Sequence, residues 1–469
     1  MDKIELYILG DQPAITNSKI KTWNIVPEND SYSGENYLPV SSHESSSLFW
    51  EIGQCVNSEY LLLQIKPGLI TFDEALLKNW VEEALKSNAA LCYSNYFELA
   101  SDGQKEHPTI EYASGSIRDD FNFGPLVLLK TAILRDYNET DAPEYHFAGW
   151  YDFRLFISRN GEMKHSSHYY YSYKEPDLRS SGVKQFDYVN PMNRERQFEM
   201  ERVATFHLKK IGALVTPPFK AVSFQKNDFE FEASVIIPVK NRFKTLSIAI
   251  NSVLTQKTSF PFNLIVIDNH STDGTSEILK NTNDNRLIHI IPERKDLGIG
   301  GCWNEGISHP ACGRFAVQLD SDDLYSNENT LQKVVDKFHE EQCAMVIGSY
   351  KMVNFNLEEI PPGVIDHREW TDKNGPNNAL RINGLGAPRA FYTPIVRQIG
   401  FPNVSYGEDY AVAIAISRTY KVGRIYEPIY LCRRWDDNTD SDLSIEKVNS
   451  HNEYKDSLRS AEIKERQKH

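Results

Sequence analysis

Three carboxylates follow directly on a short apolar run in the second half of the chain. Residues 315–319 predict a buried strand, and Asp320, Asp322 and Asp323 come at its end. Clustered acids repel one another unless a cation lies among them, and carboxylate oxygens suit a hard divalent ion that also binds phosphates. A solvated acidic turn that caps the next helix explains the same residues. The cluster alone therefore leaves both interpretations open.

Earlier segments repeat this arrangement of an apolar run that ends in polar residues. The runs at 233–239, 264–267 and 287–291 alternate with stretches of helical periodicity, which predicts a β-α-β-α-β-α-β unit with parallel strands. In open α/β sheets the ligand lies beyond the carboxyl ends of the strands. The polar residues that follow the runs would share that edge with the acid cluster: Asn241 and Arg242, then Asp268, then Arg294, Lys295 and Asp296. Four strands delivering polar groups to one edge favour a binding site.

Two further segments follow the same unit. The glycine-rich stretch 298–301 lacks the full spacing of a dinucleotide-binding loop and comes after the third strand, so it predicts a tight turn. Residues 354–385 are rich in Pro, Gly, Asn and charge, which indicates a long loop over the site.

Glu408 and Asp409 stand where a helical pattern begins, at 411–420. Carboxylates are favoured at a helix N-terminus by the helix dipole, so capping explains them. A general base explains them as well, since a carboxylate can take a proton from a hydroxyl group. Their position alone does not separate the two.

The region 232–440 resembles family 2 glycosyltransferases. Four segments occur in the order and spacing of that family: 234–239, 266–275, 320–323 and 407–410. The resemblance implies an α/β fold of the GT-A type, the nucleotide-diphospho-sugar transferase fold, in the C-terminal half. It further implies inverting transfer of a sugar from a nucleoside-diphosphate sugar to a hydroxyl of a saccharide or other acceptor.

The same resemblance implies a role for each motif residue. Asp320 and Asp322 would hold Mn²⁺ or Mg²⁺ on the diphosphate, with Asp320 also facing the ribose. Asp409, with Glu408 beside it, would be the catalytic base. Asp268 resembles the residue that pairs with uracil, which makes a UDP-sugar the expected donor. The complete expected donor-binding set is Pro238, Val239, Asn241, Asp268, Lys295, Asp320, Asp322, Asp323 and Arg434.

Two departures from the family pattern affect these expectations. Many members carry an Arg-x-His whose histidine is a metal ligand, and here Trp435 takes the histidine position, so a third protein ligand is in doubt. Arg433 or Arg434 could neutralise the diphosphate instead, or be solvated. The family's Ala-Arg-Asn is here Cys302-Trp303-Asn304, and we interpret Trp303 as a core residue.

The first half of the chain looks like a degenerate copy of the second. The segment 61–68 precedes a helix and a strand as 317–323 does later, which places Gln64 at the position of Asp320 and Asp152 at that of Asp409. Only residues 3–9 are clearly strand-like early on, so the nucleotide pocket is expected to be lost. We therefore predict a degenerate GT-A-like domain at 1–185 that supports dimerisation, acceptor binding or packing. The aromatic and histidine-rich run 165–173 is explained either by a sugar-binding surface or by a half-buried strand with alternating residues.

The remaining boundaries and the cellular setting follow from composition. We expect a linker with a helix at 186–230, a catalytic domain at 231–440 and a polar tail at 441–469 that is a fraying helix or disordered. The net charge of −14 argues against nucleic acid as a partner. No signal peptide or membrane-spanning run is evident, and the six cysteines are scattered, which predicts a cytoplasmic protein.

Two alternatives remain beside a metal-dependent glycosyltransferase. A nucleotidyltransferase would share the sheet topology, but its glycine-rich basic loop is missing after residue 239. A non-catalytic carbohydrate-binding or scaffold protein would need neither Asp322 nor Asp409. Binding of nucleotide sugars with and without Mn²⁺ separates the three.

Overall fold

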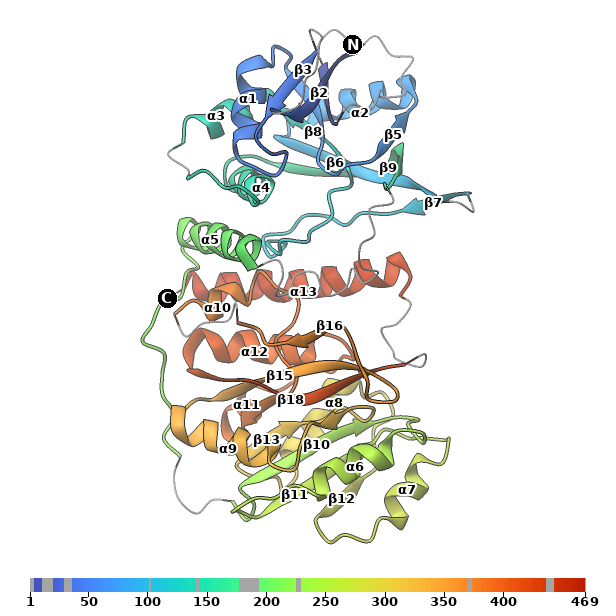
Figure 1. Ribbon diagram of the computed structural model, residues 1–469, viewed down its shortest axis with the longest axis vertical. Helices are drawn as coiled ribbons and strands as arrows, with labels where there is room; N and C mark the ends of the chain where they lie inside the picture. The colour runs from blue at the N-terminus through green and yellow to red at the C-terminus, as the bar shows by residue number, and fades with distance from the viewer. Residues whose placement is uncertain are drawn as a thin grey trace. The chain divides into compact units, whose positions relative to one another are not determined.

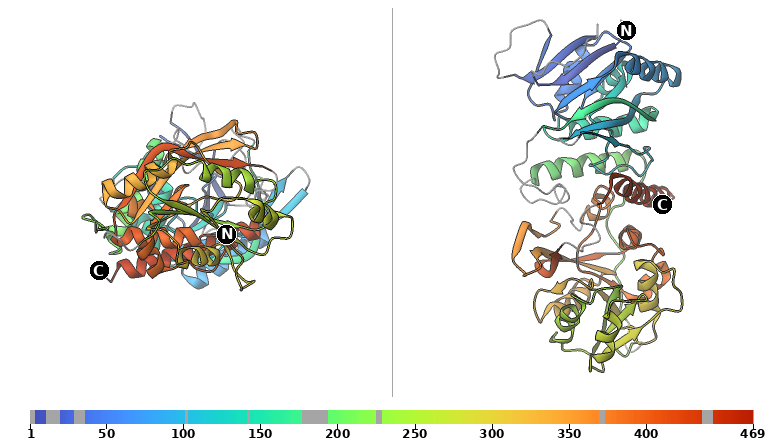
Figure 2. Two further views of the ribbon diagram at one scale, coloured as in Figure 1. Left: turned by 90° about the horizontal axis from the view of Figure 1, so that it is seen from below. Right: turned by 90° about the vertical axis from the view of Figure 1, so that its right-hand side faces the viewer.

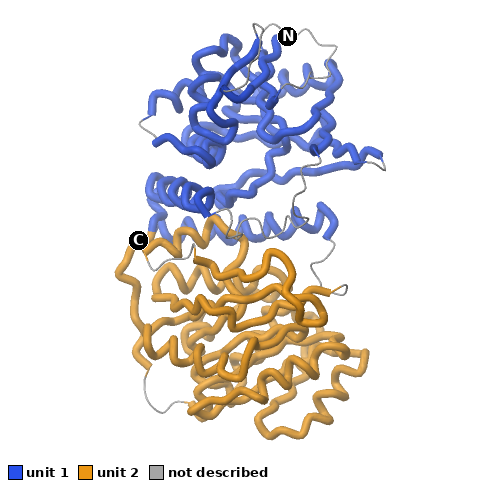
Figure 3. The backbone as a smooth tube through the Cα atoms, in the orientation of Figure 1, with its two compact units in different colours: residues 1–182, 194–214, 443–469 blue, residues 183–193, 215–442 orange. Residues whose placement is uncertain are grey.

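The computed structural model describes residues 4–10, 20–28, 36–100, 103–140, 143–176, 194–224, 229–368, 373–435 and 443–468. By their contacts the residues form two compact units, coloured separately in Figure 3: residues 1–182, 194–214 and 443–469 make unit 1, and residues 183–193 and 215–442 make unit 2. The chain therefore returns to unit 1 after completing unit 2. The predicted linker falls partly outside the described residues, at 186–193.

Unit 2 contains the predicted β-α-β-α-β-α-β segment and extends it with an antiparallel part (Figure 1). Its elements are β10 (Ala233–Val239), α6 (Leu246–Leu254), β11 (Phe262–Asp268), α7 (Thr275–Asn281), β12 (Leu287–Ile290), α8 (Ile299–Ser308), β13 (Phe315–Gln318), β14 (Leu324–Tyr325), α9 (Thr330–Glu341), β15 (Met345–Asn354), β16 (Glu359–Ile365), α10 (Gly375–Asn378), β17 (Arg389–Tyr392), α11 (Thr393–Ile399), α12 (Glu408–Thr419) and β18 (Val422–Arg434).

The sheet of unit 2 has the strand order β12-β11-β10-β13-β17-β15-β18-β14, with β16 paired to β15, and Figure 2 shows it from two further sides. The first four strands in this order are parallel, as predicted. Strand β17 runs antiparallel to both β13 and β15. The segment 354–385 differs from the predicted long loop. It holds β16, which forms a hairpin with β15, and the short helix α10.

Helices cover both faces of the parallel strands, which is why those strands are almost continuously apolar. Val235 and Ile237 point into a core that also contains α6 and α9 side chains. Ile236 points to the other face, where Gly306 of α8 lies directly against it. The carboxyl ends of these strands are thereby held in fixed positions at one edge.

Unit 1 has the same topology as unit 2. Its sheet order is β3-β2-β1-β4-β8-β6-β9-β5 with β7 paired to β6, which matches the order in unit 2 strand for strand. Its elements are β1 (Ile4–Leu9), β2 (Lys21–Pro27), β3 (Tyr37–Val40), α1 (Ser47–Cys55), β4 (Tyr60–Gln64), β5 (Leu69–Phe72), α2 (Glu74–Ser87), β6 (Leu91–Ala100), β7 (Gly103–His107), β8 (Leu126–Lys130), α3 (Thr131–Asn138), α4 (Gly149–Asn160), β9 (Met163–Lys174), α5 (Arg194–Lys210) and α13 (Ile445–Arg466). Residues 3–9 are not the only early strand-like segment, since β2 and β3 are also present.

Hydrogen bonds fix which residues of the two units are equivalent. The Oγ1 of Thr131 donates to the carbonyl of Ser58, and the Oγ1 of Thr393 donates in the same way to the carbonyl of Gly313. From these anchors the strand pairings place Ile65 at the position of Asp320. Helices α4 and α12 both have 12 residues, and counting along them places Trp150 at the position of Asp409.

The register therefore corrects the sequence-based alignment by a few positions. Gln64 corresponds to Leu319 and Asp152 to Ala411, so neither is a remnant of an acidic site residue. The pairing of β1 with β2 places Val26 at the position of Asp268. Apolar residues thus stand at three positions where unit 2 has carboxylates. The run 165–173 lies in β9, as a partly buried strand.

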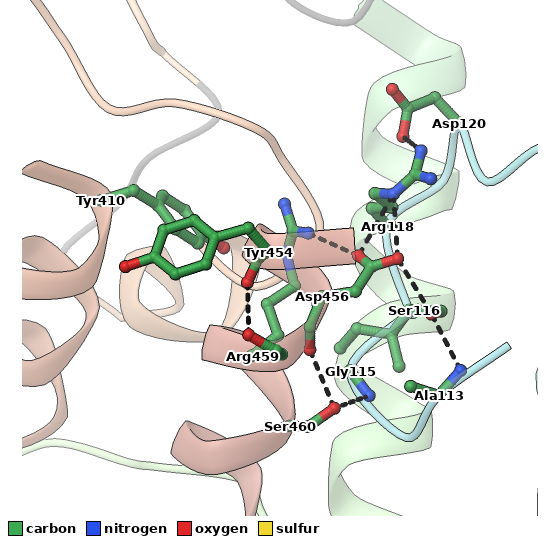
Figure 4. Close-up of polar contacts among 12 residues, drawn as sticks. Ala113, Gly115, Ser116, Arg118, Asp120, Tyr410, Tyr454, Asp456, Arg459 and Ser460 are labelled. Atoms are coloured by element: carbon green, nitrogen blue, oxygen red, sulfur yellow. Dashed lines mark hydrogen bonds and ion pairs between the residues drawn. The ribbon is translucent and has the colours of Figure 1, made fainter. Parts of the chain in front are cut away.

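The C-terminal segment is an ordered helix, which corrects the expected fraying or disordered tail. Helix α13 has 22 residues, and its buried side chains are almost all charged. Asp456 accepts hydrogen bonds from Ser116 and Arg118 and pairs with Arg459 (Figure 4). Gly115 N–H donates to Ser460 Oγ over 2.8 Å, again within unit 1. The charged composition suggested an exposed segment, but charged side chains of this helix are buried as ion pairs.

Among the described helices none has the length and apolarity required to span a bilayer. All six cysteines are free thiols, and four of them are buried.

Candidate active site

The acid cluster forms a tight turn between two strands. Asp320 lies two residues after the end of β13, and the N–H of Asp323 donates to the Asp320 carbonyl over 3.1 Å. Strand β14 begins at the residue after Asp323. The next helix, α9, begins only at Thr330. The capping interpretation of the cluster is therefore wrong, and its carboxylates need another explanation.

Asp323 builds the turn. Its Oδ1 accepts the backbone N–H of Arg433 over 2.7 Å, and Arg433 Nε donates to the carbonyl of Asp322 over 2.7 Å. Burial raises the pKa of Asp323 well above its ordinary value, and the nearby Asp322 and Asp320 raise it further. These contacts give Asp323 and Arg433 a structural role in the turn, and contact of either residue with the donor stays a prediction.

Asp320 and Asp322 are the more open carboxylates of the turn. Asp320 Oδ1 accepts from Gln318 Nε2 over 2.9 Å, and Asp322 Oδ2 lies 3.4 Å from Trp435 Nε1 and 3.8 Å from Arg242 Nε. Burial raises the pKa of Asp320; the carboxylates of Asp322 and Asp409 add to this, while Arg389 and Gln318 oppose it. Burial is thus the main reason for the raised pKa, and Arg389 is the charged group that affects Asp320 most.

Asp268 lies at the end of β11 but is closed to a ligand. Its side chain is fully buried, with Oδ1 accepting the N–H of Ser271 over 2.9 Å and Oδ2 accepting the hydroxyl of Ser276. Burial alone would raise the pKa of Asp268, but these hydrogen bonds together with His289 lower it. The structure therefore assigns Asp268 to holding the loop, which differs from the predicted contact with a nucleobase.

Asn269, the next residue, is a candidate that the sequence analysis missed. Its N–H donates to the Val239 carbonyl and its Nδ2 donates to the Leu297 carbonyl, both over 2.8 Å. Its Oδ1 is buried and has no hydrogen-bond partner among the described residues. A buried acceptor without a partner costs free energy, which makes Asn269 a candidate for a ligand contact at this sheet edge. The only sequence signal was its place at a strand end.

The other predicted donor-binding residues lie around this edge with unequal exposure. Val239 is buried and Pro238 is half-buried at the end of β10, Lys295 is exposed, and Arg434 is half-buried at the end of β18. Asn241 uses its Oδ1 to accept the N–H of Thr272 over 2.8 Å. The side chain of Asn241 therefore joins the loop after β10 to the loop after β11.

Glu408 and Asp409 begin helix α12, after Gly407 in the left-handed conformation at φ 76°. Asp409 Oδ2 forms an ion pair with Arg389 Nη2 over 2.6 Å. Glu408 is buried, and its Oε2 accepts no hydrogen bond from the described part of the chain. Burial, followed by the charge of Asp409, raises the pKa of Glu408 to about 8. Asp409 Oδ1 also accepts the N–H of Tyr410 over 2.6 Å, so capping accounts for one oxygen of Asp409 but not for its ion pair or for the burial of Glu408. Arg389 is a second residue that sequence reasoning missed.

The glycine-rich stretch 298–301 positions these acids. Gly298 is the N-cap of α8, its N–H donates to Asn403 Oδ1 over 2.8 Å, and the N–H of Gly300 donates to the Val404 carbonyl over 2.9 Å. A Cβ on Gly300 would overlap the Pro402 carbonyl. The stretch begins a helix that packs against the segment leading into α12, whereas the sequence predicted a simple turn. Trp303 is buried in the core as predicted and stacks on Phe401.

Within the described ranges, no group of three or more His, Cys, Asp and Glu side chains is arranged to hold a metal ion. Two open carboxylates, Asp320 and Asp322, do fit a hard cation that keeps water ligands and shares phosphate oxygens with a substrate. The observation that supports this fit is that both carboxylates are partly exposed and lie in one tight turn.

The chain matches one family by sequence. Residues 234–392 match the profile of Glycosyl transferase family 2, a range that includes the strands of the parallel sheet and the acid turn. In this segment the chain is similar to glycosyl transferase family 2. The GT-A-type α/β fold expected for the C-terminal half is the fold of unit 2, and unit 1 repeats its strand order.

Curated relatives carry glycosyltransferase names. An Escherichia coli protein named UDP-Glc:alpha-D-GlcNAc-diphosphoundecaprenol beta-1,3-glucosyltransferase is 26% identical over 197 residues, which cover 42% of this chain and 74% of that protein. A Rickettsia bellii glycosyltransferase is 27% identical over 264 residues, which cover 54% of this chain and only 37% of the relative. Among solved structures, Staphylococcus aureus TarS 1–349 in complex with UDP is 23% identical, with a TM-score of 0.36 over 43% of this chain and 60% of TarS.

Proposed function

We propose that this protein is a metal-dependent, inverting glycosyltransferase that moves a sugar from a nucleoside-diphosphate sugar to a hydroxyl of a saccharide or other acceptor. The observation that carries the proposal is the meeting of two acidic groups at one sheet edge. Asp320 and Asp322 come from the end of β13 and Asp409 from the start of α12, and Asp320 and Asp409 are close enough for each charge to influence the other.

Asp320 and Asp322 would hold the diphosphate through a divalent cation, Mn²⁺ or Mg²⁺, which when bound neutralises the charge that develops on the leaving group. Trp435 Nε1 already lies 3.4 Å from Asp322 Oδ2 and Arg242 Nε lies 3.8 Å from it. These two groups keep the carboxylate oriented toward the edge where the donor would lie.

Asp409 is the base in this proposal. At neutral pH Glu408, with its pKa near 8, holds its proton and cannot accept another. Asp409 takes the proton of the acceptor hydroxyl, whose oxygen forms a bond to the anomeric carbon. The bond from that carbon to the diphosphate breaks, and the nucleoside diphosphate leaves with the electron pair. Attack on the face opposite the leaving group inverts the anomeric centre, so no second carboxylate is needed as a nucleophile.

UDP is the nucleotide that we propose for the donor. The unpartnered Oδ1 of Asn269 offers an acceptor for the N–H of a uracil, close to Val239. The name of the Escherichia coli relative also specifies a UDP-sugar.

Unit 1 has no catalytic role in this proposal. Val26, Ile65 and Trp150 stand at the positions of Asp268, Asp320 and Asp409, and none of them can bind a cation or take a proton. Acceptor binding, dimerisation and packing remain the roles proposed for it.

Calorimetric titration tests the proposal. UDP, UDP-glucose, UDP-N-acetylglucosamine and GDP-mannose are titrated into the protein with and without MnCl₂, and UDP release from each sugar is followed in parallel. We expect UDP-sugar binding that requires Mn²⁺ and is lost in Asp322→Asn. The matched control is Asp336→Asn, an exposed acid on α9, which should bind as the unmodified protein does.

Absence of nucleotide binding under every condition would contradict the proposal and favour a non-catalytic carbohydrate-binding protein. Binding that is equally tight without metal and in Asp322→Asn would contradict the metal-dependent form.

A further inference from the structure

A continuous chain of contacts joins the two acidic groups of the site. Gln318 Nε2 donates to Asp320 Oδ1 over 2.9 Å, and Gln318 Oε1 accepts the backbone N–H of Arg389 over 3.2 Å. Arg389 Nη2 then pairs with Asp409 Oδ2 over 2.6 Å. Two residues without an assigned role, Gln318 and Arg389, thus connect the donor-side carboxylate to the base.

Arg389 is held rigidly from the side opposite Asp409. Its Nη1 donates to the carbonyl of Leu385 over 2.9 Å and to that of Gly386 over 3.0 Å. Gly386 adopts a φ of 76°, which a glycine reaches without strain. The side chain is only 13% exposed, so the guanidinium has little freedom to move away from Asp409.

The equivalent positions in unit 1 show that a sheet of this topology folds without the polar residues Gln318 and Arg389. The registers that relate the two units place Leu63 at the position of Gln318 and Val127 at the position of Arg389. The four residues that make these contacts in unit 2 are therefore all apolar at the equivalent positions of unit 1: Leu63, Ile65, Val127 and Trp150. Leu63 and Val127 are buried in a hydrophobic core, and Ile65 and Trp150 pack against it.

Other polar contacts are retained in both units. Tyr410 OH donates to the Ala379 carbonyl over 2.6 Å, and at the equivalent positions Tyr151 OH donates to the Ile117 carbonyl. The threonines that anchor the register, Thr131 and Thr393, are a second retained pair. The contacts that both units share stabilise the fold. The contacts of Gln318 and Arg389 occur in unit 2, beside the acidic site, and have no equivalent at the matching positions of unit 1.

We propose that Gln318 and Arg389 are positioning residues that hold the base Asp409 in a fixed place relative to the donor carboxylate Asp320. This inference rests on the proposed function. Because Asp320 and Asp409 belong to different elements, a connection through β17 fixes the distance between the donor's sugar and the base. A shift of about 1 Å in such a geometry lowers a rate by roughly 100-fold.

The test replaces each residue by its equivalent from unit 1, in Arg389→Val and Gln318→Leu. UDP-glucose and UDP-N-acetylglucosamine hydrolysis, UDP affinity with Mn²⁺ and melting temperature are measured for each variant. We expect kcat to fall about 100-fold in Arg389→Val and about 10-fold in Gln318→Leu, with the Kd of UDP changed less than threefold. Arg389→Lys should restore part of the lost kcat, since it returns the charge but only part of the hydrogen bonding.

The matched control is Thr393→Val, which removes a buried hydroxyl that both units share. It should lower the melting temperature and leave kcat unchanged, the opposite pattern to Arg389→Val. If Arg389→Val does not fold, the change in kcat is compared with the change in the Kd of UDP for Arg389→Lys and Gln318→Leu instead.

A kcat equal to that of the unmodified protein in Arg389→Val and Gln318→Leu would overturn the inference. So would a loss of UDP affinity as large as the loss of kcat/KM, because the residues would then act in donor binding. Failure of the proposed function is distinguishable, since the unmodified protein itself would neither bind UDP with Mn²⁺ nor release it from either sugar nucleotide.

Discussion

At the scale of single residues, the four aspartates of the site differ in what their surroundings leave available. The carboxylate oxygens of Asp268 and Asp323 accept hydrogen bonds from backbone N–H and hydroxyl groups of neighbouring segments. Asp320 and Asp322 remain partly open. The chemistry of a carboxylate is the same in all four, so its role is set by the hydrogen-bond donors within reach, and these come from segments distant in sequence.

Glu408 provides a prediction at this scale. Its pKa is raised from 4.5 to about 8, so it binds its proton more tightly in the folded protein than in the unfolded chain. The stability that this proton confers is present at low pH and is lost as the pH rises from about 4.5 to 8. Glu408→Gln removes this titration. The free energy of unfolding of the variant minus that of the unmodified protein should therefore increase as the pH rises through that range, by roughly 1.4 kcal/mol for each unit between the two pKa values.

Urea unfolding at pH 5, 6, 7, 8 and 9 measures this difference. Glu305→Gln, an exposed acid on α8, is the control and should follow the unmodified protein. Parallel pH profiles for Glu408→Gln and the unmodified protein would contradict the assignment of the raised pKa.

At the scale of elements, the start of α8 and the start of α12 depend on each other. The glycines of α8 allow the segment 402–404 to approach so closely that it accepts hydrogen bonds from the N–H groups of Gly298 and Gly300 at the start of α8. That segment leads directly into Gly407 and the two acids. The position of the proposed base is therefore set partly by a helix that carries no catalytic residue.

Gly300→Ala tests this dependence. The added Cβ would overlap the Pro402 carbonyl and come within 2.9 Å of Glu408 Cβ, so the start of α12 must shift. We expect a loss of stability of about 1–3 kcal/mol, typical of overpacking, together with a lower kcat for UDP-sugar hydrolysis. Ser308→Ala, at the exposed end of the same helix, should change neither. Unchanged activity and stability in Gly300→Ala would show that the two helices are not coupled.

At the scale of the whole molecule, the chain holds two copies of one topology with different surfaces at the carboxyl edge. Matching strand order through two sheets shows that the fold itself tolerates either polar or apolar residues at that edge. The last helix, α13, then belongs to unit 1 although unit 2 precedes it in sequence. Its attachment depends on Asp456, which contacts Arg118 and Arg459 in a buried position.

Asp456→Ala is expected to destabilise unit 1 and leave unit 2 intact. The substitution removes one carboxylate from two buried arginines, Arg118 and Arg459, while Arg118 keeps its ion pair with Asp120. Breaking a buried ion pair typically costs roughly 3–5 kcal/mol. Hydrogen exchange resolved by peptide should show lost protection at residues 113–121 and 445–466, while UDP binding with Mn²⁺ is retained. Glu453→Ala, an exposed acid on the same helix, should lose no protection. Uniform loss of protection in both units would contradict this division.

The sequence alone determined the parallel core of unit 2, the acid turn at 320–323 and the position of Glu408 and Asp409 at a helix start. It could do so because buried strands are apolar and because polar residues at successive strand ends must meet at one edge. The sequence also indicated the duplication, but it placed the equivalent residues a few positions away, since apolar strands can be aligned in several registers.

Only the tertiary structure decided which polar groups remain available. It showed that the side chain of Asp268 is fully buried and that Asp323 accepts the N–H of Arg433. It also showed that Asn269 Oδ1 has no partner in the described chain and that Arg389 pairs with Asp409. It also showed that the charged helix α13 is buried. These are properties of contacts between segments up to hundreds of residues apart, and no local pattern specifies which donor will meet which acceptor.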